Sequence, residues 1–399
     1  MDPVRAQYEA YPYPARDPDD EAKRLITGSP SYPAEVDHML FGGKRDWSKP
    51  IRALFAGGGT GDGLIMFAQK LAERGAPADI LYLDMSAHSR RVAEARAAAR
   101  GLTSITFETG DLLTAPERGP FDYIDCTGVL HHLPDPQAGF NALGAALAPT
   151  GGLGGMVYAP YGRTGVYPLQ EALRALTEGE DPATQVAMAK AALKSLPKTN
   201  WFGRNPHLGD HEESDAGLYD LLLHSRDRPY TAEEVAEALS GAGLNLVSFL
   251  NPGLYDPARY LPAALHDRLK DMGPIARAGL AERLAGNLKA HVFYAASTER
   301  KPAGPAPDAR PRLNGLPADA LGKQIEKRGE IRIDLIGQKY TAQIPKAAGR
   351  AVALADGRRR LGEMAQALGL DWIGFQALWR PAHDALTGFN LLRYSEQLA

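Results

Sequence analysis

The stretch IRALFAGGGTGDGLIMFA, residues 51–68, reads as a strand, a glycine turn and a helix. Residues 51–56 are a short apolar run suited to a buried parallel strand, and apolar residues return at helical spacing from Leu64. The glycines between them allow positive φ and leave room for a ligand to approach the backbone and the free N–H groups at the helix start. Because any tight strand-to-helix turn can use such glycines, this pattern alone is weak support for a nucleotide site.

Three further apolar strands follow, and polar residues stand at their ends. Residues 78–84 end in Asp84, where a doubly wound fold places a carboxylate against ribose hydroxyls. Residues 104–113 form a second segment, which contains Asp111. Residues 121–133 read FDYIDCTGVLHHL, a strand that leads into a histidine pair. These positions predict a ligand site at the carboxyl edge of a parallel sheet.

Together these motifs resemble the class I S-adenosylmethionine-dependent methyltransferases. The glycines match the family motif around the methionine part of the cofactor, Asp84 matches the ribose-binding acid and Asp111 the acid near the adenine amino group. The family has an acid two residues before the first glycine, and this chain has Phe55 there. The resemblance implies S-adenosyl-L-methionine as the cofactor, bound by Gly57, Gly58, Gly59, Gly61, Asp84, Met85, Asp111, Leu112 and Gly128.

The resemblance implies methyl transfer to an unidentified acceptor, either a small molecule or a protein side chain. One alternative is a catalytically silent protein that binds S-adenosylmethionine or regulates a partner. Another is a nicotinamide-dependent dehydrogenase, which uses a similar glycine turn. The absence of a Tyr-x-x-x-Lys pair after the fifth strand counts against the dehydrogenase.

Candidate catalytic residues cluster after the fourth and fifth strands. His131 and His132 are each either a general base or a structural residue, because imidazole titrates near neutral pH. Tyr158 ends the fifth strand and is a third candidate. We interpret Asp62 as a helix-start carboxylate and Asp125 as a buried polar residue. The residues predicted to face the acceptor are Tyr11, Tyr13, Tyr161 and Arg163.

No metal site is predicted. His207, His211 and Glu212 lie in one polar stretch, but their spacing matches no standard zinc motif. We interpret the stretch as part of a solvated cap over the active site.

The alternation of strands and helices predicts an α/β fold with a doubly wound parallel sheet covered on both faces. The resemblance implies a Rossmann-like sheet of seven strands, the last antiparallel. Residues 1–50 are expected to be an arm and lid, because the proline-rich residues 8–18 favour an extended chain. Residues 51–297 are the expected methyltransferase domain, with a helical and loop insertion at 163–230. Thr231 and Glu234 predict a capping box at the start of a helix.

Residues 298–312 are rich in proline and predict a linker, and residues 313–399 a small winged-helix-like α+β domain. Within it, residues 331–344 alternate around Gly337, as expected for a hairpin. We expect this domain to bind a protein or peptide partner or to form a homodimer. Because the linker separates the two domains, residues 1–300 are expected to keep their own core and to bind cofactor after truncation.

Composition excludes several other classes of protein. The formal net charge of −3 provides no general attraction to nucleic acid or to an anionic membrane. The single cysteine, Cys126, excludes an internal disulfide and fits a reducing compartment. No apolar run approaches the roughly 20 residues needed to span a bilayer, and no signal-peptide pattern opens the chain. We therefore expect a cytoplasmic protein.

Overall fold

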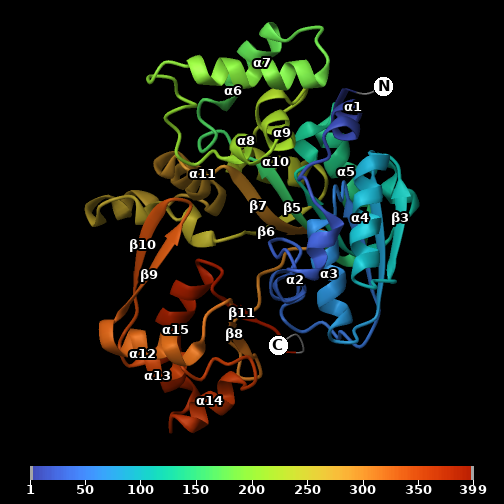
Figure 1. The fold of residues 1–399 in the computed structure, drawn as a ribbon. Coiled ribbons are helices and arrows are strands. Elements are labelled where there is room, and N and C mark those ends of the chain that lie inside the picture. Colours follow the sequence, from blue (N-terminus) through green and yellow to red (C-terminus); the bar gives the residue numbers. More distant parts are fainter. Residues whose placement is uncertain (1–2, 397–399) are drawn as a thin grey trace.

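A computed structural model describes residues 3–396 of the chain. Its centre is a seven-stranded sheet in the order β3-β2-β1-β4-β5-β7-β6, which confirms the predicted doubly wound architecture (Figure 1). The first five strands are parallel and β7 is antiparallel to both of its neighbours. The strands are β1 (Ile51–Ala56), β2 (Ala78–Asp84), β3 (Ile105–Thr109), β4 (Phe121–Thr127), β5 (Leu147–Tyr158), β6 (Asn245–Phe249) and β7 (Ala290–Ala296).

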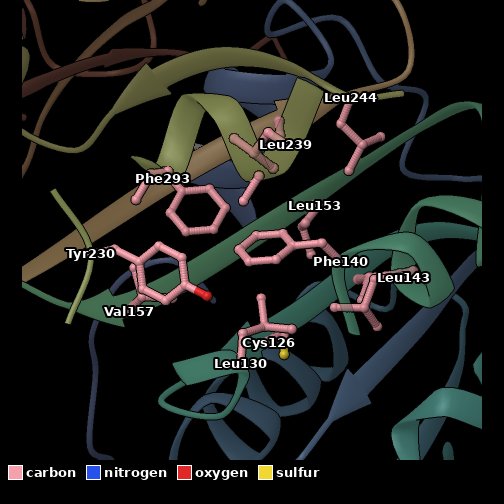
Figure 2. Close-up of a cluster of buried hydrophobic side chains, with 14 of the residues drawn as sticks. Cys126, Leu130, Phe140, Leu143, Leu153, Val157, Tyr230, Leu239, Leu244 and Phe293 are labelled. Carbon is pink, nitrogen blue, oxygen red and sulfur yellow. The ribbon is translucent and has the colours of Figure 1, made fainter. Parts of the chain in front are cut away.

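Helices cover both faces of this sheet because its central strands are apolar on both sides. Leu64, Phe67 and Leu71 of α3 pack with Phe55 on one face. Figure 2 shows the opposite face, where Phe140 of α5 meets Phe293 of β7. The first face carries α2 (Pro33–Leu40), α3 (Asp62–Ala72) and α4 (Ala87–Ala99), and the second α5 (Pro136–Ala146), α10 (Ala232–Gly241) and α11 (Pro274–Ala285).

The expectation of an extended N-terminal segment is wrong for its first part. Residues 8–10 belong to the helix α1 (Pro3–Ala10). Proline is tolerated in the first turn of a helix, so Pro3 starts α1, and the chain leaves the helix before Pro12. Beyond Ala10 the segment is non-helical until a short 3₁₀ helix, Pro18–Ala22.

The insertion after β5 is helical near its start and irregular later. Figure 1 shows α6 (Val166–Leu176) and α7 (Pro182–Ser195) at the end of the molecule opposite the C-terminal helices. The chain returns through α8 (Asp210–Glu213), α9 (Asp215–Leu218) and a π-helical turn, Tyr219–Leu223. The predicted capping box then starts α10, since Thr231 accepts from the Glu234 N–H and the Glu234 side chain accepts from the Thr231 N–H.

The C-terminal elements have a core of their own, centred on Trp379 and Phe375. The predicted hairpin is β9 (Glu330–Leu335) and β10 (Gln338–Gln343), followed by α13 (Ala348–Val352), α14 (Leu361–Ala367) and α15 (Trp372–Thr387). Strand β8 (Pro311–Leu313) pairs with β11 (Leu392–Tyr394), and α12 (Ala318–Arg328) precedes the hairpin. The predicted N-terminal arm (1–50) and C-terminal domain (313–399) include residues 1–2 and 397–399, which lie outside the described chain.

The segment expected to be a linker is packed against α2. The Ala303 N–H donates to the His38 carbonyl oxygen at 2.7 Å, and an Arg300 nitrogen donates to the Leu40 carbonyl oxygen at 2.9 Å. Ala303 and Ala309 are buried in the C-terminal core. No helix within residues 3–396 is both long enough and apolar enough to cross a membrane.

Candidate functional site

A cavity of about 620 Å³ opens where the parallel strands end, at the edge that binds ligands in doubly wound folds. The turn after β1 forms one wall and the ends of β2 and β4 another. The N-terminal segment and the insertion close the rest. Lining residues include Tyr8, Tyr13, Ser31, Gly57, Gly58, Gly59, Gly61, Asp84, Met85, Asp111, Leu112, Asp125, Gly128, His132, Tyr158, Asp220 and Arg226.

The glycine turn requires backbone angles that other residues adopt at a cost. Gly57, Gly59 and Gly61 have φ of 69°, 52° and 98°. A Cβ on Gly57 would lie 2.4 Å from a methyl group of Val129, so the turn leaves no space for a side chain there. Gly61 begins α3 without a side-chain cap, which leaves backbone N–H groups at the cavity for a polar ligand.

Two acidic side chains stand where the sequence places them, at the ends of β2 and β3. Asp84 is nearly buried and accepts from the Gly59 N–H at 2.8 Å and from the Ser86 N–H at 2.8 Å. A carboxylate can accept about four hydrogen bonds, so Asp84 keeps capacity for ribose hydroxyls. Asp111 is exposed and accepts from the Leu113 N–H at 2.9 Å. The turn, the two acids and the open N–H groups fit S-adenosylmethionine.

The N-terminal segment crosses the glycine turn. Thr60 Oγ1 donates to the Pro14 carbonyl oxygen at 2.7 Å, and Arg16 pairs with Asp62 at 2.6 Å. Tyr13 lines the cavity, whereas Tyr11 stacks on Tyr219 of the insertion with ring centroids 5.3 Å apart. The segment is therefore held against the glycine turn, at the edge of the cavity.

The two histidines of the pair have different surroundings. His132 lines the cavity, and its Nδ1–H donates to the Arg226 carbonyl oxygen at 2.7 Å. Because a carbonyl oxygen only accepts, this bond places the proton of a neutral imidazole on Nδ1 and leaves Nε2 as the basic nitrogen. His131 is fully buried outside the cavity lining, and within residues 3–396 neither ring nitrogen has a hydrogen-bond partner. Burial lowers the pKa of His131 well below its usual value.

A buried polar cluster lies beside His132. Asp220 accepts from the Tyr158 hydroxyl at 2.9 Å and from the Tyr8 hydroxyl at 3.1 Å. Burial raises the pKa of Asp220 and, with the nearby Asp220 charge, that of both tyrosines. The ring of His224 stacks on that of His132 at a centroid distance of 3.7 Å. The cluster brings together α1, β5 and the insertion.

The cluster has the composition of a metal site, since ligand atoms of His132, Asp220 and His224 lie within 4.8 Å of one another. The tautomers favour hydrogen bonding instead. His224 Nδ1 accepts from the Arg226 N–H at 3.0 Å, so a neutral His224 carries its proton on Nε2, which faces the Tyr8 hydroxyl. If His224 bound a metal ion through Nε2, its proton would be on Nδ1. That proton would point at the Arg226 N–H, which is itself a donor.

Besides Tyr11, two more of the predicted acceptor residues lie outside the cavity lining. Arg163 is buried in an ion pair with Asp227 at 2.8 Å and is stacked on the Tyr158 ring, 3.8 Å from its centroid. Tyr161 lies outside the cavity lining, near Arg283. Arg163 therefore packs against the ring of Tyr158 and does not line the cavity itself.

The sequence analysis did not identify Tyr8 and Asp220 as cavity residues, and it interpreted Asp125 only as a buried polar residue, although all three line the cavity. The signal for Asp220 was a lone acid inside the apolar run LYDLLL, residues 218–223. An acid in such a run is buried and needs partners. Tyr8 carried no comparable signal, because only the folded chain brings it to Asp220.

Comparisons with known proteins agree with this geometry. A family model described as a methyltransferase domain matches residues 54–153. An uncharacterized protein of Synechococcus sp. is 30% identical over 300 residues, which cover 73% of this chain and 70% of that protein.

Two solved structures of PKMT2 from Rickettsia typhi have a similar fold. One has a TM-score of 0.64 at 16% identity, covering 94% of this chain and 77% of that chain. The other, in complex with AdoHcy, has a TM-score of 0.63 at 15% identity, covering 92% and 76%. This chain belongs to the class I S-adenosylmethionine-dependent methyltransferases.

Proposed function

We propose that this methyltransferase acts on an amine or hydroxyl acceptor and that His132 removes the acceptor's proton. The observation that carries the proposal is the Nδ1–H bond of His132, a cavity-lining residue, to the Arg226 carbonyl oxygen, which makes Nε2 the basic nitrogen of a neutral imidazole. A base of this kind contributes about 10²- to 10⁴-fold to a rate.

The cofactor is S-adenosylmethionine, which when bound supplies an electrophilic methyl group on a sulfonium. We propose that the glycine turn, Asp84, Met85, Asp111, Leu112 and Gly128 hold it. The acceptor then occupies the end of the cavity bounded by Tyr8, Tyr158 and Asp220. These groups orient the acceptor, and the lid segment excludes water.

The charge of the acceptor end favours an amine over a neutral hydroxyl compound. Asp220 is buried, and within residues 3–396 no Lys or Arg nitrogen forms an ion pair with it. A cationic acceptor would supply the missing positive charge. Tyr158 and Tyr8 keep the carboxylate hydrogen-bonded when the acceptor is absent.

The acceptor can be found by labelling. A lysate is prepared from a deletion strain of the source organism and separated into small-molecule and protein fractions. Purified protein and methyl-labelled S-adenosylmethionine are then added to each fraction. Mass analysis of the labelled product identifies the methylated atom. A product methylated on carbon or sulfur would contradict the proposed acceptor class.

The role of His132 is tested on that acceptor with His132→Gln. We expect kcat to fall about 10²- to 10⁴-fold with unchanged affinity for S-adenosylhomocysteine. The matched control is His266→Gln, on an exposed histidine far from the cavity lining, which should keep parent activity. Parent activity in His132→Gln would exclude His132 as the base.

We also propose a protein or peptide partner, with self-association as the alternative, and a cytoplasmic location. We propose that the C-terminal domain, which has a hydrophobic core of its own, contacts the protein or peptide partner. Light scattering of the purified protein tests whether two copies associate instead. The single buried cysteine is consistent with a cytoplasmic location.

A further inference from the structure

The position at the end of β1 where the family has an acid is Phe55 in this protein, and the neighbouring strand β4 carries an acid beside it. Phe55 occupies the family position and packs between Phe67 and Tyr123, with ring centroids 5.5 and 6.5 Å away. In the parallel pairing of β1 with β4, the residue opposite Phe55 is Asp125. Paired residues on neighbouring strands point to the same face of a sheet. An apolar ring and a carboxylate thus stand side by side, at the cavity that both residues line.

The surroundings of Asp125 hold a carboxylate at a defined place. Ser31 Oγ donates to Oδ2 at 2.6 Å and the Tyr123 hydroxyl donates to the same oxygen at 3.1 Å. Thr127 Oγ1 donates to Oδ1 at 2.9 Å. Three hydroxyl groups from three positions therefore orient one side chain that is only 5% exposed.

The charge of Asp125 is not balanced by the protein. No Lys, Arg or His nitrogen within the described part of the chain forms an ion pair with it. Burial raises the pKa of Asp125, and the three hydroxyl groups oppose that effect. A buried carboxylate without a cationic partner is costly unless a ligand supplies the charge.

We propose that Asp125 binds the ammonium group of the cofactor's methionine part, in place of the acid missing at position 55. An ammonium group is compact and cationic, and one of its N–H groups can donate to the acceptor site that the three hydroxyl groups leave open on Asp125. This inference rests on S-adenosylmethionine as the cofactor and is independent of the acceptor and of His132.

The test is calorimetric binding of three compounds to the parent protein and to Asp125→Asn, a variant of nearly the same shape. S-adenosylhomocysteine carries the ammonium group. Its deaminated analogue, S-adenosyl-4-thiobutanoate, lacks only that group, and 5′-methylthioadenosine lacks the whole amino-acid part. In the parent we expect the deaminated analogue to bind about 10- to 100-fold more weakly than S-adenosylhomocysteine, as for the loss of a charged hydrogen bond.

In Asp125→Asn that difference should disappear. S-adenosylhomocysteine should lose about 10- to 100-fold in affinity while 5′-methylthioadenosine stays within about twofold. The matched control is Asp84→Asn, which should weaken all three compounds because each carries the ribose. If Asp125→Asn binds S-adenosylhomocysteine as the parent does, or loses affinity for all three compounds equally, the assignment is overturned.

A second set of variants guards against a folding defect. Asp125→Ser keeps a hydroxyl group for Ser31 and Tyr123, and it should show the same selective loss if Asp125→Asn does not fold. Phe55→Glu combined with Asp125→Val returns the acid to β1. The double variant Phe55→Glu/Asp125→Val should bind S-adenosylhomocysteine at least about tenfold more tightly than Asp125→Val alone. No recovery would contradict the exchange of positions between the two strands.

Discussion

Glu35 of α2 and Arg393 of β11 form a buried ion pair between the two domains. Glu35 is fully buried, and Arg393 lies 7% exposed against it. The same carboxylate accepts from Asn390 Nδ2 at 2.7 Å and from the Tyr294 hydroxyl. The C-terminal strand thus neutralises a charge buried on α2.

We predict that Arg393→Met destabilises the protein by about 3 kcal/mol. Breaking a buried pair by removing one partner costs about 3–5 kcal/mol, because the other charge stays buried. Two neutral donors, Asn390 and Tyr294, remain on Glu35, so we expect the lower end of that range. Methionine keeps the apolar stem of arginine, so the loss reports the charge rather than packing.

The double variant Glu35→Gln/Arg393→Met isolates this effect. With no buried charge left, we expect a loss of only about 1 kcal/mol, the value of a typical hydrogen bond. The double variant should therefore be about 2 kcal/mol more stable than Arg393→Met, because it no longer buries an unpaired charge.

The assay is urea denaturation at neutral pH, followed by far-ultraviolet circular dichroism. Arg380→Met is the matched control, because Arg380 lies exposed on α15 and its pair with Asp384 is 3.8 Å long. It should change the free energy of unfolding by less than about 0.5 kcal/mol. If Arg393→Met costs no more than this control, or if the double variant loses as much as the single one, the reasoning is refuted.

The same contact changes the expectation for truncation. Ending the chain at residue 300 removes Arg393 and Asn390 from Glu35, and it removes Ser395, which donates to Asp37 at 2.5 Å. The sequence alone suggested that residues 1–300 would keep an intact core. With these contacts in view, we expect the truncated protein to be less stable than Arg393→Met.

The remaining predictions concern the cofactor site and the dependence of stability on pH. Asp84→Ala and Gly59→Arg should each abolish calorimetric binding of S-adenosylhomocysteine, the first by removing the ribose acceptor and the second by filling the turn, where a Cβ already meets the Tyr13 carbonyl oxygen at 3.3 Å. Binding at parent affinity would show that the cofactor lies elsewhere. Burial raises the pKa of Asp37 to about 6, above the value of about 3.9 in an unfolded chain. Asp37 therefore stabilises the fold fully below about pH 4, and this contribution is lost as the pH rises to about 6. Two pKa units correspond to about 3 kcal/mol, so the unfolding free energy of Asp37→Asn minus that of the parent should rise by about 3 kcal/mol from pH 3 to pH 7. A difference that stays constant with pH would contradict this role.

The sequence by itself determined the sheet and the turn after β1. Short apolar runs, separated by segments of helical periodicity, specify buried parallel strands with helices between them. The glycine turn and Asp84 were predictable because the backbone angles and the strand end are local properties. The helix α12 was missed although Leu321 and Ile325 have helical spacing, because its other positions are mostly polar.

Only the tertiary structure decided what surrounds the cavity. The difference between His131 and His132 depends on the Arg226 carbonyl oxygen, and Asp220 meets Tyr8 across 212 positions of the chain. The pairing of β1 with β4 places Asp125 opposite Phe55, a register that neither strand specifies alone. Contacts of this kind depend on how distant segments pack, so local sequence patterns carry no record of them.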